Sequence, residues 1–425
     1  MDTYYDLLPK VVSEGCTVKF RLRSRYEPIL MESGSSLVLR IRSLNNFKEI
    51  TEIYVTVDTA GEIQFDFTPG ENGEYQLILY SEENPGKPIT TTAFYVVRSE
   101  LIKLRPCKGD FHMHTCYSDG RQSPGYMAAH GRALGFDFAA ITDHRIYDSS
   151  LEAIERAEEY GMDILLFPGE EINYYLGLGH IVSINADRSI SDTVRGKDYT
   201  IDELAERIAE EVGEELDDLD MLPGKNRALF GYYCGIVKKI HQAGGIAITA
   251  HPYWTSQGTY DLARKTYEQI LESRIFDAVE VFGGQGFQKN MLSLARINQY
   301  HNENKKITLL GNSDAHNAYN HTMGQTWTIV FSESLTHEGI LKGIKEGRTV
   351  PCVTSGGSDN TIAVGDTELV EYSYFLLREF FPRHDEICTV LGGLYKRALR
   401  TGRQLEGTKD LQAELQDFYD EYFAC

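Results

Sequence analysis

The chain has 425 residues, of which 42% are hydrophobic and 25% charged, and this composition excludes a disordered protein. Its formal net charge of -21 at pH 7 argues against a protein whose main task is to hold nucleic-acid backbones, because such affinity comes largely from Lys and Arg. Seven cysteines without CxxC spacing do not form a disulfide framework, and no apolar run is long enough to cross a membrane. These features predict a cytoplasmic protein of two or three domains.

Residues 1–104 show the alternation of apolar and polar residues that is typical of β-strands. Turn sequences such as 58–61 and 69–73 separate the apolar runs at the spacing of a sandwich. Tyr75, which follows Gly73 by two residues, resembles a sandwich corner tyrosine. We therefore expect an immunoglobulin-like β-sandwich, an accessory domain that serves positioning or oligomerisation or else binds a sugar or a partner.

From residue 105 to about 357, short apolar strands alternate with helical stretches, which predicts a parallel α/β sheet or barrel. The expected strands end at His114, Thr142, Pro168, Ala186, Ala250, Phe282, Gly311 and Ser332. A helical insert is expected at about 187–239, with a capping box at 200–203. Its acidic run, residues 210–220, is either a solvated surface or a lid near the barrel mouth.

The last segment, residues 358–425, is predicted to be a helical extension. Aromatic residues and Leu recur there at three- and four-residue spacing, which favours a core or docking face over a ligand site. Helices are expected at about 371–381, 386–400 and 409–423.

The strongest chemical signal is His112-Met-His114 at the end of the first α/β strand. Residues two apart on a strand point to the same face, so these two imidazoles can meet one metal ion. Further His, Asp and Glu side chains follow at strand ends or adjacent turns, where an α/β barrel places its site. They are Asp119, His144, Glu171, His180, His251, Asp314 and His316. Imidazole and carboxylate without cysteine suit zinc, iron or manganese.

The order and wording of these motifs resemble the polymerase-and-histidinol-phosphatase (PHP) superfamily. The matching motifs are His112-Met-His114, Thr142-Asp-His144, Gly169-Glu-Glu171, His251-Pro252 and Asp314-Ala-His316, and the resemblance covers about residues 106–355. It implies a distorted seven-stranded β/α barrel that holds two or three divalent ions at its C-terminal mouth. The sandwich in front of the barrel makes the chain similar to two-domain bacterial members rather than to polymerase-attached modules.

Carried over by position, the resemblance also implies how the ligands are shared. Divided among three ions, the sets would be His112, His114, Glu171 and Asp314; Glu171, His180 and His251; and Asp119, His144 and His316. Glu171 would thus bridge the first two ions. It is preferred over Glu170 because it stands two residues after Gly169, as in the Gly-x-Glu turn.

A few other residues are candidates for roles around the ions. Asp143 could accept a proton from a water nucleophile or orient an imidazole, and the second role is favoured because ligating histidines usually hydrogen-bond an outer carboxylate. Arg145 and His321 are candidates for phosphate contacts, with Arg121 and Asn317 as weaker ones. Each of these is equally compatible with a loop-bracing role.

Metal-assisted hydrolysis is the expected chemistry, since divalent ions lower the pKa of a bound water and neutralise charge on phosphoryl oxygens. The leading interpretation is a phosphoesterase for small phosphomonoesters, with two or three manganese, iron or zinc ions. Its catalytic residues would be Glu171, Asp143, Arg145 and His321. The alternatives are hydrolysis of a carbamate or carboxyl ester, a nuclease or phosphodiesterase activity, and a non-catalytic metal-binding protein. A small phosphorylated molecule is the expected partner; nucleic acid and membranes are not favoured, and assembly into homo-oligomers stays open.

Overall fold

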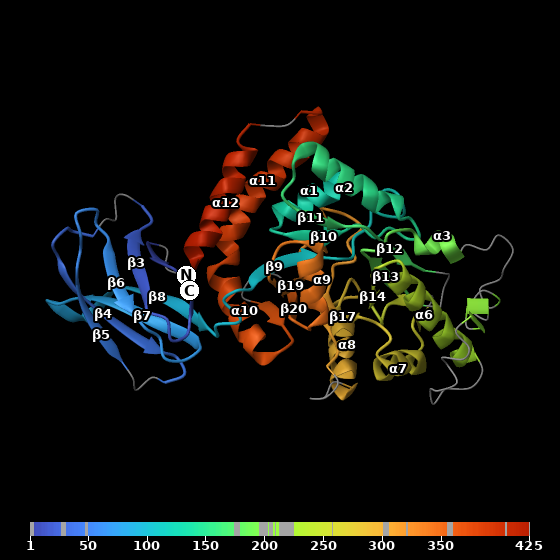
Figure 1. Cartoon of the computed structure of the whole chain (residues 1–425), viewed down its shortest axis with the longest axis horizontal. Helices are drawn as coiled ribbons and strands as arrows, with labels where there is room; N and C mark the ends of the chain where they lie inside the picture. The colour runs from blue at the N-terminus through green and yellow to red at the C-terminus, as the bar shows by residue number, and fades with distance from the viewer. Residues whose placement is uncertain are drawn as a thin grey trace. The chain divides into compact units, whose positions relative to one another are not determined.

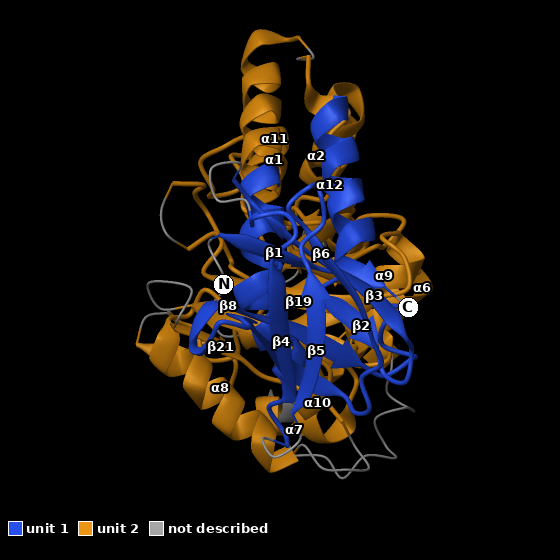
Figure 2. Ribbon diagram, turned by 90° about the vertical axis from the view of Figure 1, so that its left-hand side faces the viewer, with its two compact units in different colours: residues 1–105, 371–387, 409–425 blue, residues 106–370, 388–408 orange. Residues whose placement is uncertain are grey.

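The computed structural model describes residues 4–424 except for 27–30, 47–49, 174–178, 195–202, 204–206, 209, 212–224, 257, 301–305, 320–321, 355–359 and 404–405. The chain forms two compact units, which Figure 2 colours separately. Unit 1 comprises Met1–Arg105, Glu371–Ile387 and Lys409–Cys425, and unit 2 comprises Pro106–Val370 and Cys388–Thr408. Both ends of the chain therefore contribute to unit 1, while the division into 1–104, 105–357 and 358–425 stays a prediction.

The fold mixes strands and helices, as the sequence predicts, and unit 1 contains two β-sheets (Figure 1). The smaller sheet has the order β1 (Tyr5–Leu8), β3 (Val18–Ser24) and β6 (Ile63–Phe67). The larger has the order β22 (Phe423–Ala424), β2 (Val11–Ser13), β8 (Asn84–Val97), β7 (Gly73–Ser81), β4 (Ser36–Ser43) and β5 (Thr51–Thr56). Strands β3 to β8 confirm the predicted runs, whereas β1, β2 and β22 are too short to show alternation.

The two sheets of unit 1 share one hydrophobic core. Phe20 of β3 stacks on Phe65 of β6 at 5.3 Å between ring centroids and lies 4.8 Å from Phe94 of β8, so aromatic rings from both sheets meet. The hydroxyl of Tyr75 donates a hydrogen bond to the carbonyl oxygen of Glu71 at 3.2 Å. This upstream bond is the one expected of a corner tyrosine.

Three C-terminal helices confirm the helical prediction for this part of the chain: α10 (Thr367–Glu379), α11 (Phe381–Thr401) and α12 (Thr408–Tyr422). Within unit 1, the end of α10 is joined to the N-terminal strands by a buried ion pair. The ammonium of Lys10 lies 3.1 Å from the carboxylate of Glu379, and both side chains are only 5% exposed. Lys10 also donates to the hydroxyl of Thr92 at 2.9 Å, so its charge is held by polar partners.

Replacing Lys10 by Met is expected to destabilise unit 1 by about 3 kcal/mol, because the buried carboxylate of Glu379 would lose the ammonium that pairs with it at 3.1 Å. The double variant Lys10→Met/Glu379→Leu should recover most of this loss, since it removes both charges. Urea unfolding of the three proteins measures the effect. Equal stability of the single variant and the wild type would contradict a structural role for the pair.

Unit 2 contains two mixed sheets. One has the order β11 (Leu165–Phe167), β10 (Phe138–Ala140), β9 (Arg105–Asp110), β19 (Thr326–Ser332), β20 (Thr349–Thr354) and β21 (Thr361–Ala363). The other has the order β12 (Gly169–Ile172), β13 (Ile181–Ile184), β14 (Ile246–Thr249), β17 (Ala278–Phe282) and β18 (Leu309–Gly311). Isolated bridges at Met113–Ala315 and His144–Glu171 connect the two sheets. The strands of the predicted parallel sheet or barrel are parallel only in part, because β13 runs antiparallel to both of its neighbours.

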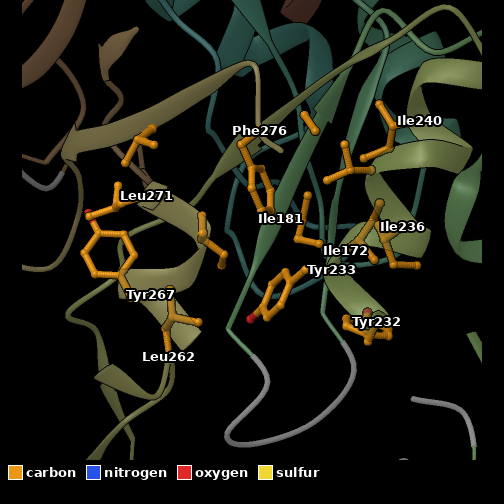
Figure 3. Close-up of a cluster of buried hydrophobic side chains, with 14 of the residues drawn as sticks. Ile172, Ile181, Tyr232, Tyr233, Ile236, Ile240, Leu262, Tyr267, Leu271 and Phe276 are labelled. Carbon is orange, nitrogen blue, oxygen red and sulfur yellow. The ribbon is translucent and has the colours of Figure 1, made fainter. Parts of the chain in front are cut away.

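Helices flank these strands in unit 2: α1 (Pro124–Ala133), α2 (Asp148–Tyr160), α3 (Ile190–Val194), α6 (Lys225–Gln242), α7 (Arg264–Ser273), α8 (Phe287–Tyr300) and α9 (His337–Lys345). Successive residues of a strand point to opposite faces of the sheet, so neighbours along β13 enter different hydrophobic cores. Val182 belongs to a cluster shared with β9, β10 and β18, whereas Ile181 packs with Ile236 and Ile240 of α6 (Figure 3).

Nearly half of the predicted helical insert lies outside the described residues, including residues 200–202 of its capping box and most of its acidic run at 210–220. Helices α3 and α6 belong to the described part of this segment. Within the described residues, no helix combines the length and the apolar character that crossing a membrane requires.

Candidate metal centre

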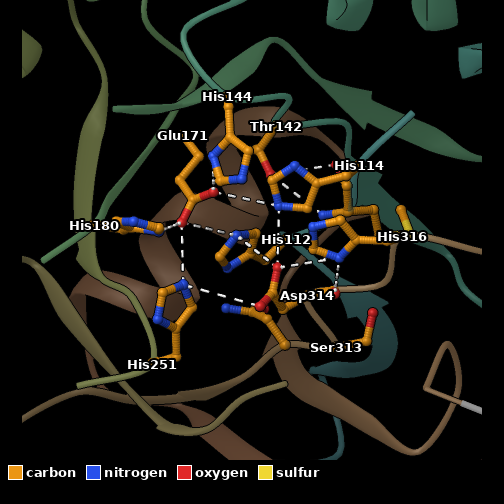
Figure 4. A network of polar contacts seen from close by, with 12 residues as sticks. His112, His114, Thr142, His144, Glu171, His180, His251, Ser313, Asp314 and His316 are labelled. Atoms are coloured by element: carbon orange, nitrogen blue, oxygen red, sulfur yellow. Dashed lines mark hydrogen bonds and ion pairs between the residues drawn. The ribbon is translucent and has the colours of Figure 1, made fainter. Parts of the chain in front are cut away.

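The side chains singled out in the sequence converge on one point of unit 2 (Figure 4). Their ligand-type atoms form four overlapping groups, and within each group these atoms lie within 4.8 Å of one another. The groups are His114, Asp119, His144 and His316; His112, His114 and Asp314; His112, Glu171 and His251; and His144, Glu171 and His180. All nine candidate ligands are thus in the cluster. Glu171 and His180 also form a group with His144, which the resemblance assigns to a different ion, so the groups in the structure overlap more than the three implied ligand sets do.

The His-x-His segment lies just beyond the ladder of β9, which ends at Asp110. Its middle residue, Met113, pairs with Ala315 in an isolated bridge and accepts a hydrogen bond from the backbone N–H of Thr142 at 2.8 Å. These contacts keep the segment extended between its neighbours. His112 and His114 therefore point to the same side, as the two-residue spacing predicts.

Glu171 of β12 lies at the centre of the cluster and is fully buried. Its carboxylate oxygens lie within 3.4 Å of imidazole nitrogens from five histidines. The distances are 3.4 Å to His112, 3.3 Å to His114, 2.7 Å to His144, 2.6 Å to His180 and 3.1 Å to His251. Glu170 instead accepts hydrogen bonds from the backbone N–H groups of Ile190 and Ser191, at 2.5 and 3.1 Å. The geometry therefore favours Glu171 as the carboxylate that meets the histidines.

Asp314 supplies a second carboxylate, with a side chain that is 9% exposed. One of its oxygens lies 3.0 Å from Nε2 of His114 and 3.4 Å from Nε2 of His112. Its backbone has a φ of 51°, in the left-handed region that non-glycine residues seldom adopt and that is concentrated at functional sites. A Cβ at Gly284 would come within 2.7 Å of the Asp314 Cβ, so a side chain at this position would displace the carboxylate.

Asp119 forms the open side of the cluster, with a side chain that is 56% exposed. Its carboxylate lies 3.3 Å from His316 and 3.6 Å from His144. The turn that carries it passes close to the His-x-His segment, because a Cβ at Gly120 would lie 2.5 Å from the carbonyl oxygen of His114. Glycine at this position therefore allows the Asp119 turn to reach the imidazoles.

Opposite charges shift the pKa values of this cluster. Burial alone would lower the pKa of His144, but Glu171 and Asp119 raise it to about 10. Burial likewise opposes the charged form of Glu171, yet His180, His112 and His144 hold the pKa of this carboxyl well below its ordinary value. His114 differs, since its burial outweighs the attraction of Asp314 and lowers its pKa.

The donor set fits divalent metal ions. Nε2 of His112, both ring nitrogens of His114 and Oε2 of Glu171 are buried without a hydrogen-bond partner. Buried polar atoms without partners are rare in native proteins and call for an ion or another ligand. With neutral imidazoles, the cluster also concentrates the negative charge of three carboxylates, Asp119, Glu171 and Asp314, which divalent cations would offset. All donors are nitrogen or oxygen, and this suits zinc, iron or manganese.

Metal binding is expected to release protons. The folded pKa of His144, about 10, lies above its ordinary value of 6.5, so its protonation stabilises the metal-free fold fully below pH 6.5, and this contribution is lost as pH rises towards 10. A metal ion requires the neutral imidazole and must displace this proton. Adding zinc or manganese to weakly buffered protein at pH 7.5 should therefore acidify the solution, and less so for His144→Gln. Metal binding without proton release would contradict this protonation state.

The outer candidates take different positions. The carboxylate of Asp143 accepts hydrogen bonds from the backbone N–H and the hydroxyl of Thr115, at 2.8 and 2.5 Å, and from the hydroxyl of Ser118 at 2.5 Å. It therefore braces the loop after His114, while its predicted roles of orienting an imidazole or accepting a proton stay predictions. Arg145 is exposed next to the cluster, with a φ of 56°. His321 lies outside the described residues.

The two weaker candidates for phosphate contacts belong to adjoining loops. The backbone N–H of Arg121 donates to the carbonyl oxygen of His316 at 3.0 Å, and its side chain is exposed. The side-chain oxygen of Asn317 accepts hydrogen bonds from Gln122 at 3.3 Å and from the backbone of Tyr319 at 3.0 Å. Asn317 is thus used in bracing its own loop.

One residue of the site escaped the sequence-based prediction. Glu280 of β17 is fully buried, and one of its carboxylate oxygens lies 2.8 Å from Nδ1 of His112. The signal was present, because Glu280 is the single charged residue in the otherwise apolar strand Ala278–Phe282. A carboxylate inside such a strand needs a polar partner.

Comparison with known proteins identifies relatives of this region. A family model described as the PHP domain matches residues 110–307. The DNA polymerase/3'-5' exonuclease PolX of Bacillus subtilis is 34% identical over 109 residues, which are 25% of this chain and 18% of PolX. The chain thus spans less than a fifth of that relative's length.

The matches among solved structures share less sequence with this chain. A two-domain protein containing a predicted PHP-like metal-dependent phosphoesterase, from Bacteroides vulgatus, is 21% identical; the match covers 64% of this chain and 70% of that one, with a TM-score of 0.43. The lesion-specific endonuclease PfuEndoQ from Pyrococcus furiosus is 16% identical, with 57% and 56% covered and a TM-score of 0.35.

Proposed function

We propose, on the premise that residues 110–307 of this chain belong to the PHP domain family, that the protein is a metal-dependent hydrolase of phosphate esters. We further propose that small phosphomonoesters are its substrates. The observation that carries the proposal is the position of Glu171, a buried carboxylate within 3.4 Å of five imidazoles. Packing of the core does not account for this arrangement, because burying a charged group costs several kcal/mol unless the charge is compensated.

The ions would be held by the nine side chains of the cluster, with the shared position of Glu171 suiting a bridge between two of them. When bound, the ions would supply an activated water and neutralise charge on the phosphoryl oxygens. The chain's own residues would do the positioning. Asp143 holds the loop that follows His114, and Asp119 closes the open side of the cluster.

Part of the negative charge of a phosphate substrate would be compensated by side chains as well as by the metal ions. Arg145 is exposed next to His144, and a guanidinium there suits a contact with a phosphate through charge-assisted hydrogen bonds. We propose Arg145 and His321 for this role. A net charge of -21 repels a long phosphate chain but not a single phosphate next to metal ions, which favours small substrates. Nucleic-acid hydrolysis is the second candidate function, because the similar protein PolX is by its name a polymerase and exonuclease.

We propose a finer architecture as well. Seven strands, β9, β10, β12, β13, β14, β17 and β18, would form the distorted barrel, and the two isolated bridges that connect the sheets support its closure. For unit 1 we propose an immunoglobulin-like sandwich, supported by the corner bond of Tyr75 and by the parallel pairing of β2 with β8. A cytoplasmic setting is proposed because the seven cysteines of the sequence lack the spacing of a disulfide framework.

A hydrolysis panel tests the proposed function. The protein, loaded with manganese, iron or zinc, is assayed on small phosphomonoesters, phosphodiesters, single-stranded DNA and RNA, carboxyl esters and carbamates. The fastest turnover is expected on phosphomonoesters, and Arg145→Ala should raise KM or lower kcat there without removing the metals. Preferential cleavage of oligonucleotides would establish the second candidate instead. Turnover confined to carbamates or carboxyl esters would contradict a phosphoesterase of either kind.

A further inference from the structure

Glu280 is a buried carboxylate that links the ends of several strands at the cluster. One oxygen accepts hydrogen bonds from Nδ1 of His112 and from the amide of Asn312, both at 2.8 Å. The other accepts from the backbone N–H of His251 at 2.7 Å. The side-chain oxygen of Asn312 in turn accepts from the backbone N–H of Phe111 at 3.0 Å. The segments that follow β9, β14 and β18 are therefore tied to one side chain of β17.

These contacts decide which nitrogen of His112 faces the cluster. A ring whose Nδ1–H donates to Glu280 keeps Nε2 as its lone-pair nitrogen. That Nε2 lies 3.4 Å from both Glu171 and Asp314 and has no hydrogen-bond partner of its own. A carboxylate behind the imidazole also strengthens it as a donor to a metal, and loss of such outer partners commonly weakens metal affinity.

We infer that Glu280 is a positioning residue of the metal centre: it selects the tautomer and orientation of His112 and holds the backbone of His251 beside it. This inference rests on the metal binding in the proposed function. It assigns Glu280 no contact with the ions or with substrate. Its effect is transmitted through the two histidines, which both lie within 3.4 Å of Glu171.

Glu170 provides a matched control within the same unit. Both glutamates are fully buried and each accepts several hydrogen bonds. The partners of Glu170 are the backbone N–H groups of Ile190 and Ser191 and the hydroxyl of Ser189, none of them an imidazole. Loss of a buried negative charge in general should therefore affect Glu280→Gln and Glu170→Gln alike. Loss of a positioned imidazole should affect Glu280→Gln alone.

The test measures zinc affinity of the chelator-treated full-length protein by competition with a chromophoric chelator. Wild type, Glu280→Gln and Glu170→Gln are compared after circular dichroism has established that each is folded. Glu280→Gln is expected to weaken at least one zinc site roughly 10–100-fold, and Glu170→Gln to stay within about 3-fold of wild type. If Glu280→Gln does not fold, Glu280→Asp is measured against the same expectation, because it keeps the charge but withdraws the carboxylate from His112.

The outcomes separate this inference from the proposed function. Tight zinc binding by wild type with unchanged binding by the folded Glu280 variant would overturn the inference and leave the function standing. Equal weakening in Glu170→Gln would also overturn it, since the effect would then not depend on His112. A wild-type protein that binds no zinc would overturn the proposed metal function and this inference together.

Discussion

Replacing Glu171 by Gln is expected to lower kcat/KM for the best phosphomonoester by more than about 10³-fold, a larger effect than the loss of an outer partner of a metal ligand. The physical reason is its central position, since one carboxylate meets His112, His114, His144, His180 and His251. Gln has nearly the same size but carries no charge and presents an N–H₂ group to one side of these rings. Steady-state kinetics with each metal measure the effect.

Glu170→Gln is the control for this prediction, because the neighbouring side chain is equally buried but bonds the backbone at Ile190 and Ser191. It should keep most of the activity. Activity retained in Glu171→Gln but lost in Glu170→Gln would show that the other carboxylate of the turn serves the metals.

Removing the metals is expected to abolish turnover and to lower the thermal stability of the protein. A ligand present at 1,000 times its dissociation constant stabilises the folded state by about 4 kcal/mol, so unfolding of unit 2 should move to a clearly lower temperature after chelation. Without cations, the carboxylates Asp119, Glu171 and Asp314 depend on protonated histidines for compensation. Scanning calorimetry before and after chelation, and again after manganese or zinc is added back, measures the shift.

In this experiment, Glu171→Gln distinguishes the loss of metal from the cluster from other effects of the chelator on stability. Its unfolding temperature should respond much less to chelation than that of the wild type, because a shared ligand is gone. Full activity in the presence of a strong chelator, with no change in the unfolding temperature, would contradict a role for metals in catalysis and in stability.

Much of the candidate site could be predicted because its signals are local. His112 and His114 are two residues apart, Asp143 and His144 follow a short apolar run, and such patterns need no knowledge of the fold. Their convergence could be expected because strand ends meet at one edge of an α/β sheet. The choice between adjacent glutamates was predicted from one motif and agrees with the hydrogen bonds of Glu170 to the start of α3.

Other features depend on distant parts of the chain. The partner of Lys10 is Glu379, 369 residues further on, and no local pattern indicates such a pair. The antiparallel course of β13 follows from pairings on both sides, which the four residues of this strand cannot reveal by themselves. Glu280 could be noticed as a charge in an apolar strand, but its partner His112 lies 168 residues away.

Elemental analysis tests the central claim most directly. Protein purified without chelators, and a sample reconstituted with manganese, iron or zinc, is measured for bound metal per chain alongside Glu171→Gln. The account predicts two to three ions per wild-type chain, because nine nitrogen and oxygen donors lie in four overlapping groups, and fewer in the variant. Less than one ion per wild-type chain, with no uptake on reconstitution, would contradict it.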